Sequence, residues 1–123
     1  MPHSAAVLAR AGALGVPRIH FGVGTTNLLG LMGEAGADVV GIDWRTPLAA
    51  AIPLVGDRAV QGNLDPTLVF APTSVVREKT AQAVEAGRAA EGHVFNLGHG
   101  VLPETDPDVL ARVVDHVHEL TAG

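Results

Sequence analysis

A single histidine flanked by two glycines, His99, stands in the stretch "GHVFNLGHG" at residues 92–100. An imidazole exchanges a proton near neutral pH and offers a ligand either a hydrogen bond or a positive charge. The preceding residues indicate a strand that ends at Leu97, and Gly98 and Gly100 would let the backbone turn closely while leaving space beside the ring for a ligand. On this pattern alone, a functional His99 and a purely structural one are about equally supported.

Asp43 and Asn63 mark the ends of two other apolar stretches, "GIDW" at 41–44 and "QGNLDP" at 61–66. At a strand end a carboxylate can act as a base or accept hydrogen bonds. For Asp43, capping the next helix or holding a neighbouring loop is the slightly better interpretation. Gln61, Asn63 and Asp65 share one loop, in which Asn, Asp and Pro are typical turn residues, and contact of Asp43, Asn63 or Asp65 with a substrate stays open. The lone tryptophan, Trp44, is most simply a packing residue.

The stretch "GVGTTN" at 22–27 offers backbone N–H groups that could bind an anion at the start of a helix. It lacks the Lys and Ser/Thr of a phosphate-binding P-loop, and Asn27 stands where a GxGxxG motif has its third glycine. A tight turn with an ordinary Thr cap is therefore the favoured interpretation.

The remaining five histidines do not have the spacing of a metal site. His116 and His118 are two residues apart on an expected helix and point in different directions, and His3, His20 and His93 each stand alone. For each we expect a surface histidine or a buried one with its hydrogen bonds satisfied. The chain has no cysteine, so it forms neither a disulfide nor a thiolate zinc site.

Composition indicates one soluble, packed domain. The 123 residues are 47% hydrophobic, and no apolar run reaches the roughly 18 residues of a membrane-spanning helix. The formal net charge is −5 with eight scattered Lys and Arg, which argues against nucleic acid or an anionic membrane as the main partner. The N-terminus lacks the basic-then-apolar order of a signal peptide, so we expect a cytoplasmic protein.

Strand-like and helical stretches alternate four times along the chain. Strands are expected at 17–23, 37–44, 58–65 and 93–98, and helices at 25–36, 46–56, 71–87 and 106–123, after the end of an earlier helix at 3–15. Thr73 or Ser74 is the expected cap of the third helix. Its candidate buried positions are Val75, Val76, Ala83 and Val84. The inner face of the last helix is expected to carry Val109, Leu110, Val113, Val114 and Val117.

This rhythm predicts an α/β fold with a parallel sheet and right-handed crossovers. The strands are almost continuously apolar, which is typical of strands buried on both faces. An eight-fold β/α barrel takes about 250 residues, so four units would make half of one. An open flavodoxin-type sheet, covered on both sides, is the alternative. The pattern alone does not separate the two.

Three motifs carry a resemblance to a known family: "VVGIDW", "QGNLDP" and "GHVFNLGHGVLPETDPD", in this order. Over essentially the whole chain, the sequence resembles the C-terminal part of uroporphyrinogen decarboxylase. The resemblance implies that residues 1–123 are the C-terminal half of a single (β/α)8 TIM barrel domain. It implies a cytoplasmic carboxy-lyase of haem and porphyrin biosynthesis that removes four acetate carboxyl groups from uroporphyrinogen III, giving coproporphyrinogen III. It also implies a homodimer that needs neither a metal nor an organic cofactor.

One functional residue follows from the resemblance: the family's "NLGHG" histidine falls on His99, which would bind a substrate carboxylate and assist proton movement. The family's "RQAGR" motif, its pyrrole-binding aspartate, and its tyrosine and serine or threonine have no counterpart here. A substrate with eight carboxylates needs several cations, which this acidic chain with scattered arginines lacks. We therefore expect the chain alone to be inactive and to need the missing N-terminal part of the barrel.

Two alternatives remain. The chain could be a non-catalytic half barrel that persists by self-association, because half a barrel exposes apolar side chains and unpaired strand edges. The second alternative is a fragment of a cobalamin-dependent methyltransferase-like barrel. Such a barrel would be expected to carry a cysteine near His99, and this chain has none.

Overall fold

Four short parallel strands form a single sheet in the computed structural model, which describes all 123 residues. They are β1 (Ile19–Phe21), β2 (Val39–Gly41), β3 (Ala59–Gln61) and β4 (His93–Val94), and their spatial order is β1-β2-β3-β4. A flavodoxin-like sheet would instead have the order 2-1-3-4-5. Strictly sequential neighbours are the arrangement of a β/α barrel. The strand order therefore favours the partial barrel over the open sheet.

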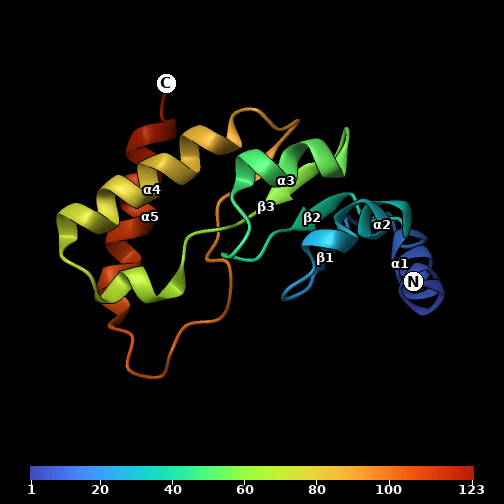
Figure 1. The fold of residues 1–123 in the computed structure, drawn as a ribbon, viewed down its shortest axis with the longest axis horizontal. Helices are drawn as coiled ribbons and strands as arrows, with labels where there is room; N and C mark the ends of the chain where they lie inside the picture. The colour runs from blue at the N-terminus through green and yellow to red at the C-terminus, as the bar shows by residue number, and fades with distance from the viewer.

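A helix follows every strand, as the alternating pattern predicts (Figure 1). The turn after β1 contains the 3₁₀ helix η1 (Thr26–Leu28) and leads into α2 (Leu29–Glu34). Helix α1 (Pro2–Gly12) precedes the first strand. The helices after the other strands are α3 (Leu48–Val55), η2 (Pro66–Phe70), α4 (Thr73–Gly87) and α5 (Pro107–Thr121). The α-helices and η1 lie within the expected ranges or within one residue of them, whereas η2 lies between the expected third strand and the helix that follows it. α4 and α5 lie side by side at one end of the molecule, and α1 lies at the other.

The two faces of the sheet differ in how they are covered. Val40 and Val60 are paired neighbours on β2 and β3, and both are fully buried against α2 and α3. On the opposite face, Ile19, Phe21 and Val94 remain 48%, 43% and 44% exposed. The expectation of strands buried on both faces is thus wrong for this chain by itself. Helices cover only one face, and the uncovered face is the one that points into a closed barrel.

Two clusters of buried side chains hold these elements together. The larger one joins β2 and β3 to α2 and α3 and contains Leu29, Met32, Ala37, Val40, Ile42, Leu48, Ala51, Val55 and Val60. The smaller one joins Leu64, after β3, to α4 and α5 through Val76 and Val113. The first core supports the loops after β1 and β2, and the second supports those after β3 and β4.

Several local expectations are wrong. No side chain caps α4: its N-cap is Pro72, so neither Thr73 nor Ser74 has that role. On α5, Val114 was expected on the inner face but is exposed. The residues of α5 that are buried are Val113 and His116. The fourth strand is regular only at His93–Val94 and continues as one isolated bridge between Leu64 and Leu97.

None of the helices combines the length and the apolar character that crossing a membrane requires.

Candidate active site

The turn after β1 is fixed by a carboxylate from the turn after β2. Gly24 has a φ of +67°, which glycine adopts without strain, and its N–H donates to Oδ2 of Asp43. The hydroxyl of Thr25 donates back to the carbonyl of Gly22 at 2.9 Å, so Thr25 stands at the N-cap position of η1 but its side chain makes no capping hydrogen bond. "GVGTTN" is therefore a tight turn, and the anion on its backbone is the chain's own Asp43.

Asp43 is buried and fully engaged in holding the two loops. Its Oδ1 accepts the backbone N–H of Arg45 at 2.7 Å, and the Arg45 guanidinium lies 3.6 Å from its Oδ2. Burial alone would raise the pKa of Asp43. The N–H groups of Gly24 and Arg45, with the Arg45 charge, outweigh it and leave the pKa below its ordinary value. Asp43 is therefore an ionised carboxylate that organises the loops, which is the interpretation the sequence slightly favours.

Asn63 ties the loop after β3 to the loop after β2. Its Nδ2 donates to the carbonyl of Asp43 at 3.0 Å and to the carbonyl of Thr46. The Thr46 hydroxyl in turn contacts the hydroxyl of Thr26 in the turn after β1. Three consecutive strand-end loops thus form one hydrogen-bonded network, in which Asn63 has a structural role.

The loop after β4 joins the same network through Gly98. The N–H of Trp44 donates to the Gly98 carbonyl at 3.3 Å, and the N–H of Gly98 donates to Leu64 at 2.8 Å. A Cβ on Gly98 would overlap the backbone of Trp44, whereas a Cβ on Gly100 would meet nothing within 4 Å. The expectation that both glycines make room for a ligand is therefore wrong for Gly98. That residue is glycine because the Trp44 backbone occupies the space.

His99 follows this anchor directly and is exposed, with no hydrogen bond to either ring nitrogen. It lies in the long connection of residues 95–106 between β4 and α5, which Figure 1 shows as an extended loop. The backbone of His99 is thus held through Gly98 at the carboxyl ends of the strands, while its side chain is free. Its assignment to substrate binding stays a prediction.

Arg45 is the residue of this edge that the sequence analysis missed. Its guanidinium carbon lies 4.6 Å from the centre of the Trp44 ring, and its side chain is 53% exposed. A cation directly after "GIDW", at the carboxyl end of a buried strand, is the signal that would have identified it. Trp44, expected only to pack, instead carries Arg45 on its ring and keeps one side in solvent.

The other polar residues singled out in the sequence have local roles. Asp65 caps η2 by accepting the N–H of Thr67 at 2.8 Å, as its turn-forming character predicts. Nε2 of His93 lies 2.6 Å from the carbonyl of Gly62, so this histidine is satisfied. His20 departs from the expectation, because its buried Nδ1 has no partner. No group of three His, Cys, Asp or Glu side chains has the arrangement of a metal site.

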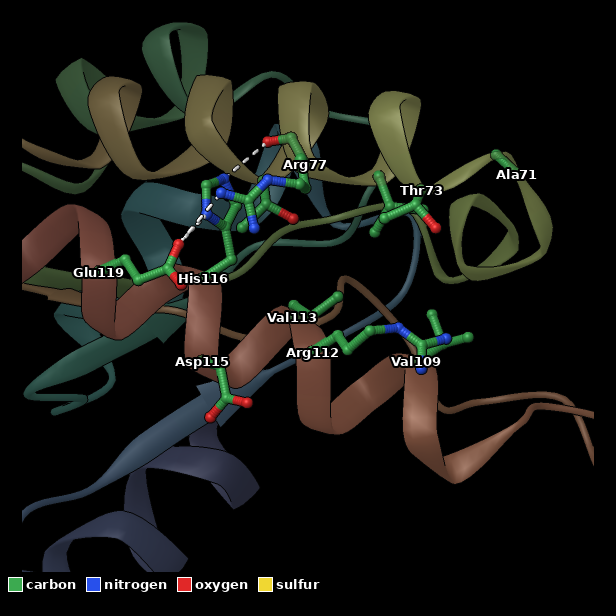
Figure 2. A pocket seen from close by; sticks show the side chains of 11 residues that line it. Ala71, Thr73, Arg77, Val109, Arg112, Val113, Asp115, His116 and Glu119 are labelled. Atoms are coloured by element: carbon green, nitrogen blue, oxygen red, sulfur yellow. Dashed lines mark hydrogen bonds and ion pairs between the residues drawn. The ribbon is translucent and has the colours of Figure 1, made fainter.

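A cavity of about 180 Å³ lies between α4 and α5, on the outer helices and away from the strand-end loops (Figure 2). Three of its polar side chains pair with one another: Nη2 of Arg77 donates to Glu119 at 3.1 Å, and Nδ1 of His116 lies 3.2 Å from the same oxygen. His116 and Arg77 lower the pKa of Glu119. Nε2 of His116 faces the carbonyl of Arg77 at 3.2 Å. This cluster ties α4 to α5 and leaves the strand ends as the better candidate site.

Comparison with known proteins identifies the family to which these loops belong. A family model described as "Uroporphyrinogen decarboxylase (URO-D)" matches residues 1–120. The chain belongs to the uroporphyrinogen decarboxylase family. It is 79% identical to a uroporphyrinogen decarboxylase of Nocardioides sp. over 95% of the chain, and 68% identical to one of Salinispora tropica over 98%. The resemblance seen in the sequence motifs is confirmed.

The matches to uroporphyrinogen decarboxylases also show how much of such a protein is present. The chain spans about a third of the length of these relatives, 34% of the Nocardioides protein and 33% of the Salinispora protein. Among solved structures, a methyltransferase from Methanosarcina mazei matches with a TM-score of 0.76 over 94% of the chain and 35% of its own length. Its 16% identity shows the fold alone. Four parallel β/α units of a partial barrel in a decarboxylase family are therefore shown.

Proposed function

We propose that this chain supplies the C-terminal part of a single barrel domain that decarboxylates uroporphyrinogen III to coproporphyrinogen III. At each of four acetate side chains, the bond between the carboxyl carbon and the methylene carbon breaks. Carbon dioxide leaves, and a proton is added to the remaining carbon to give a methyl group. The observation that carries the proposal is the strand-end network, which holds His99 at the edge where β/α barrels bind substrates.

His99 is assigned to a substrate carboxylate. A protonated imidazole would give that carboxylate a charge-assisted hydrogen bond, and a ring nitrogen could also take part in proton movement. The side chain is exposed and has no partner in the chain, so a ligand does not have to displace one. The assignment includes no metal and no organic cofactor.

The chain by itself is proposed to be inactive. Its uncovered sheet face carries exposed Ile19, Phe21 and Val94, which the remaining part of the barrel would bury. The substrate carries eight carboxylates, and the cations for most of them would come from the same missing part. Without that part the exposed face favours association between copies. The complete protein is proposed to be a cytoplasmic homodimer.

A chimera tests the proposal. In the Nocardioides decarboxylase, the matching third is replaced by this chain, which is 79% identical to it. We expect the chimera to form coproporphyrinogen from uroporphyrinogen and the isolated chain to give no product above a protein-free control. An inactive but folded chimera would refute the proposed function. Turnover by the isolated chain would refute its proposed dependence on the rest of the barrel.

A further inference from the structure

The guanidinium of Arg45 is positioned by an ion pair with Asp43 and by the ring of Trp44. Nη1 of Arg45 forms an ion pair with Oδ2 of Asp43 at 3.6 Å, and the Trp44 ring supports the guanidinium from one side at 4.6 Å. The backbone N–H of Arg45 is bonded to Asp43, but none of its side-chain N–H groups makes a hydrogen bond. An arginine has five such donors in a planar fork, and apart from the ion pair with Asp43 those of Arg45 have no partner in the chain.

No other Lys or Arg of the chain combines this position with free donors. Side chains of five of the eight donate to acceptors in the chain: Arg18, Arg58, Arg77, Lys79 and Arg88. Of the other three, Arg10 lies on α1 and Arg112 on α5. Only Arg45 lies in a loop that follows a strand.

The neighbours of Arg45 connect it to the loop of His99. The ring that supports Arg45 belongs to Trp44, whose backbone is packed against Gly98 and donates to its carbonyl. A displacement of Trp44 would therefore move Arg45 and the backbone next to His99 together. Arg45 and His99 therefore extend from loops that are joined by backbone contacts.

We infer that Arg45 is a substrate-binding residue that takes one carboxylate group in its guanidinium fork. This inference rests on the proposed function, in which the substrate carries eight carboxylates. A planar fork matches a carboxylate with two parallel N–H···O bonds. Asp43 and Trp44 hold the fork in place before the ligand arrives, which reduces the entropy lost on binding.

The test uses the chimera described above, with Arg45→Gln, Arg45→Lys and the control Arg10→Gln on the outer helix α1. We expect Arg45→Gln to raise the KM for uroporphyrinogen about tenfold with kcat changed less than about twofold. Arg45→Lys keeps the charge but not the fork, so it should restore part of that loss. The KM of the parent should rise with salt more steeply than the KM of Arg45→Gln.

Each outcome separates this inference from the proposed function. If the parent chimera decarboxylates uroporphyrinogen and Arg45→Gln matches Arg10→Gln in KM and salt dependence, the inference fails while the function stands. If the parent is folded but inactive, the proposed function itself fails. If both Arg45 variants lose their cooperative thermal transition, Arg45 belongs to the loop structure and the inference is overturned.

Discussion

The two ends of the sheet use their charged side chains in opposite ways. At the amino end of β1, Arg18 donates from its backbone N–H, its Nε and its Nη2 to Asp38 on the neighbouring segment, at 2.8, 2.8 and 2.9 Å. At the carboxyl ends, Asp43 is satisfied by backbone groups, while the side chains of Arg45 and His99 make no hydrogen bond. At the amino end Arg18 and Asp38 pair fully with each other, whereas at the carboxyl end Arg45 keeps only a 3.6 Å ion pair with Asp43 and the His99 ring has no partner.

This difference separates residues that stabilise the fold from residues available to a ligand. In β/α barrels the carboxyl-end loops carry the chemistry and the amino-end contacts contribute stability. Here the carboxylate Asp43 and the amide Asn63 fix the loops, so Arg45 and His99 extend from loops that are held by hydrogen bonds. A substitution at the amino end should change stability alone, whereas one at the carboxyl end should also change activity.

The largest expected effect is on the packing beneath the carboxyl-end loops. Ile42 precedes Asp43 and is 1% exposed, whereas Ile19 at the amino end of β1 is 48% exposed. Ile42→Ala should lower the free energy of unfolding by about 2–5 kcal/mol, because it removes buried methyl groups and leaves a cavity. Ile19→Ala should lower it by less than about 1 kcal/mol. Urea unfolding at a concentration where the chain is monomeric measures both, and equal losses there would mean that Ile19 is also buried within one copy.

Gly98 and Gly100 provide the next comparison, because they flank the same histidine. Gly98→Ala should destabilise the chain by about 1–3 kcal/mol, since the new methyl group must displace the Trp44 backbone. In the chimera it should also reduce turnover, because Arg45 and His99 move with that backbone. Gly100→Ala places its methyl group in open space and should change neither property. Similar effects of the two substitutions would show that Trp44 does not pin the loop of His99.

The smallest expected effect is at the closed amino end. Hydrogen bonds from the Arg18 side chain and backbone lower the pKa of Asp38 from 3.8 to about 2. Because the folded-state pKa is depressed, the stabilisation is complete above about pH 4 and is lost as the pH falls toward 2. Asp38→Asn should therefore lower the urea midpoint slightly at pH 7 and leave it unchanged near pH 2.

Asp43→Asn, at the carboxyl ends of the strands, is the counterpart of Asp38→Asn at their amino ends. Asp38→Asn should leave the kcat/KM of the chimera unchanged, whereas Asp43→Asn should reduce it, because Asp43 fixes the loops after both β1 and β2. A loss of activity in Asp38→Asn at unchanged folded fraction would contradict the separation between the two ends.

Much of the architecture was predictable because its signals are local. Glycines and prolines mark the ends of the helices, and apolar runs mark the strands, so all four β/α units appear in the sequence. The uncovered sheet face and the close contact of Gly98 with Trp44 were not predictable, since both depend on which strands become neighbours. The free fork of Arg45 was missed for the same reason: its chemistry depends on Asp43 and Trp44 being placed around it, which composition does not reveal.

His99 gives the most direct test of the account, in which the carboxyl-end loops form the active site. In the chimera, His99→Asn keeps a neutral hydrogen bond but removes the charge. A charge-assisted bond is typically worth about 1.5–3 kcal/mol, so kcat/KM should fall on the order of ten- to a hundredfold. Because His99 is exposed and unpartnered, the Tm should not change. A sharply lowered Tm with normal turnover of the folded enzyme would make His99 a structural turn residue and contradict the account.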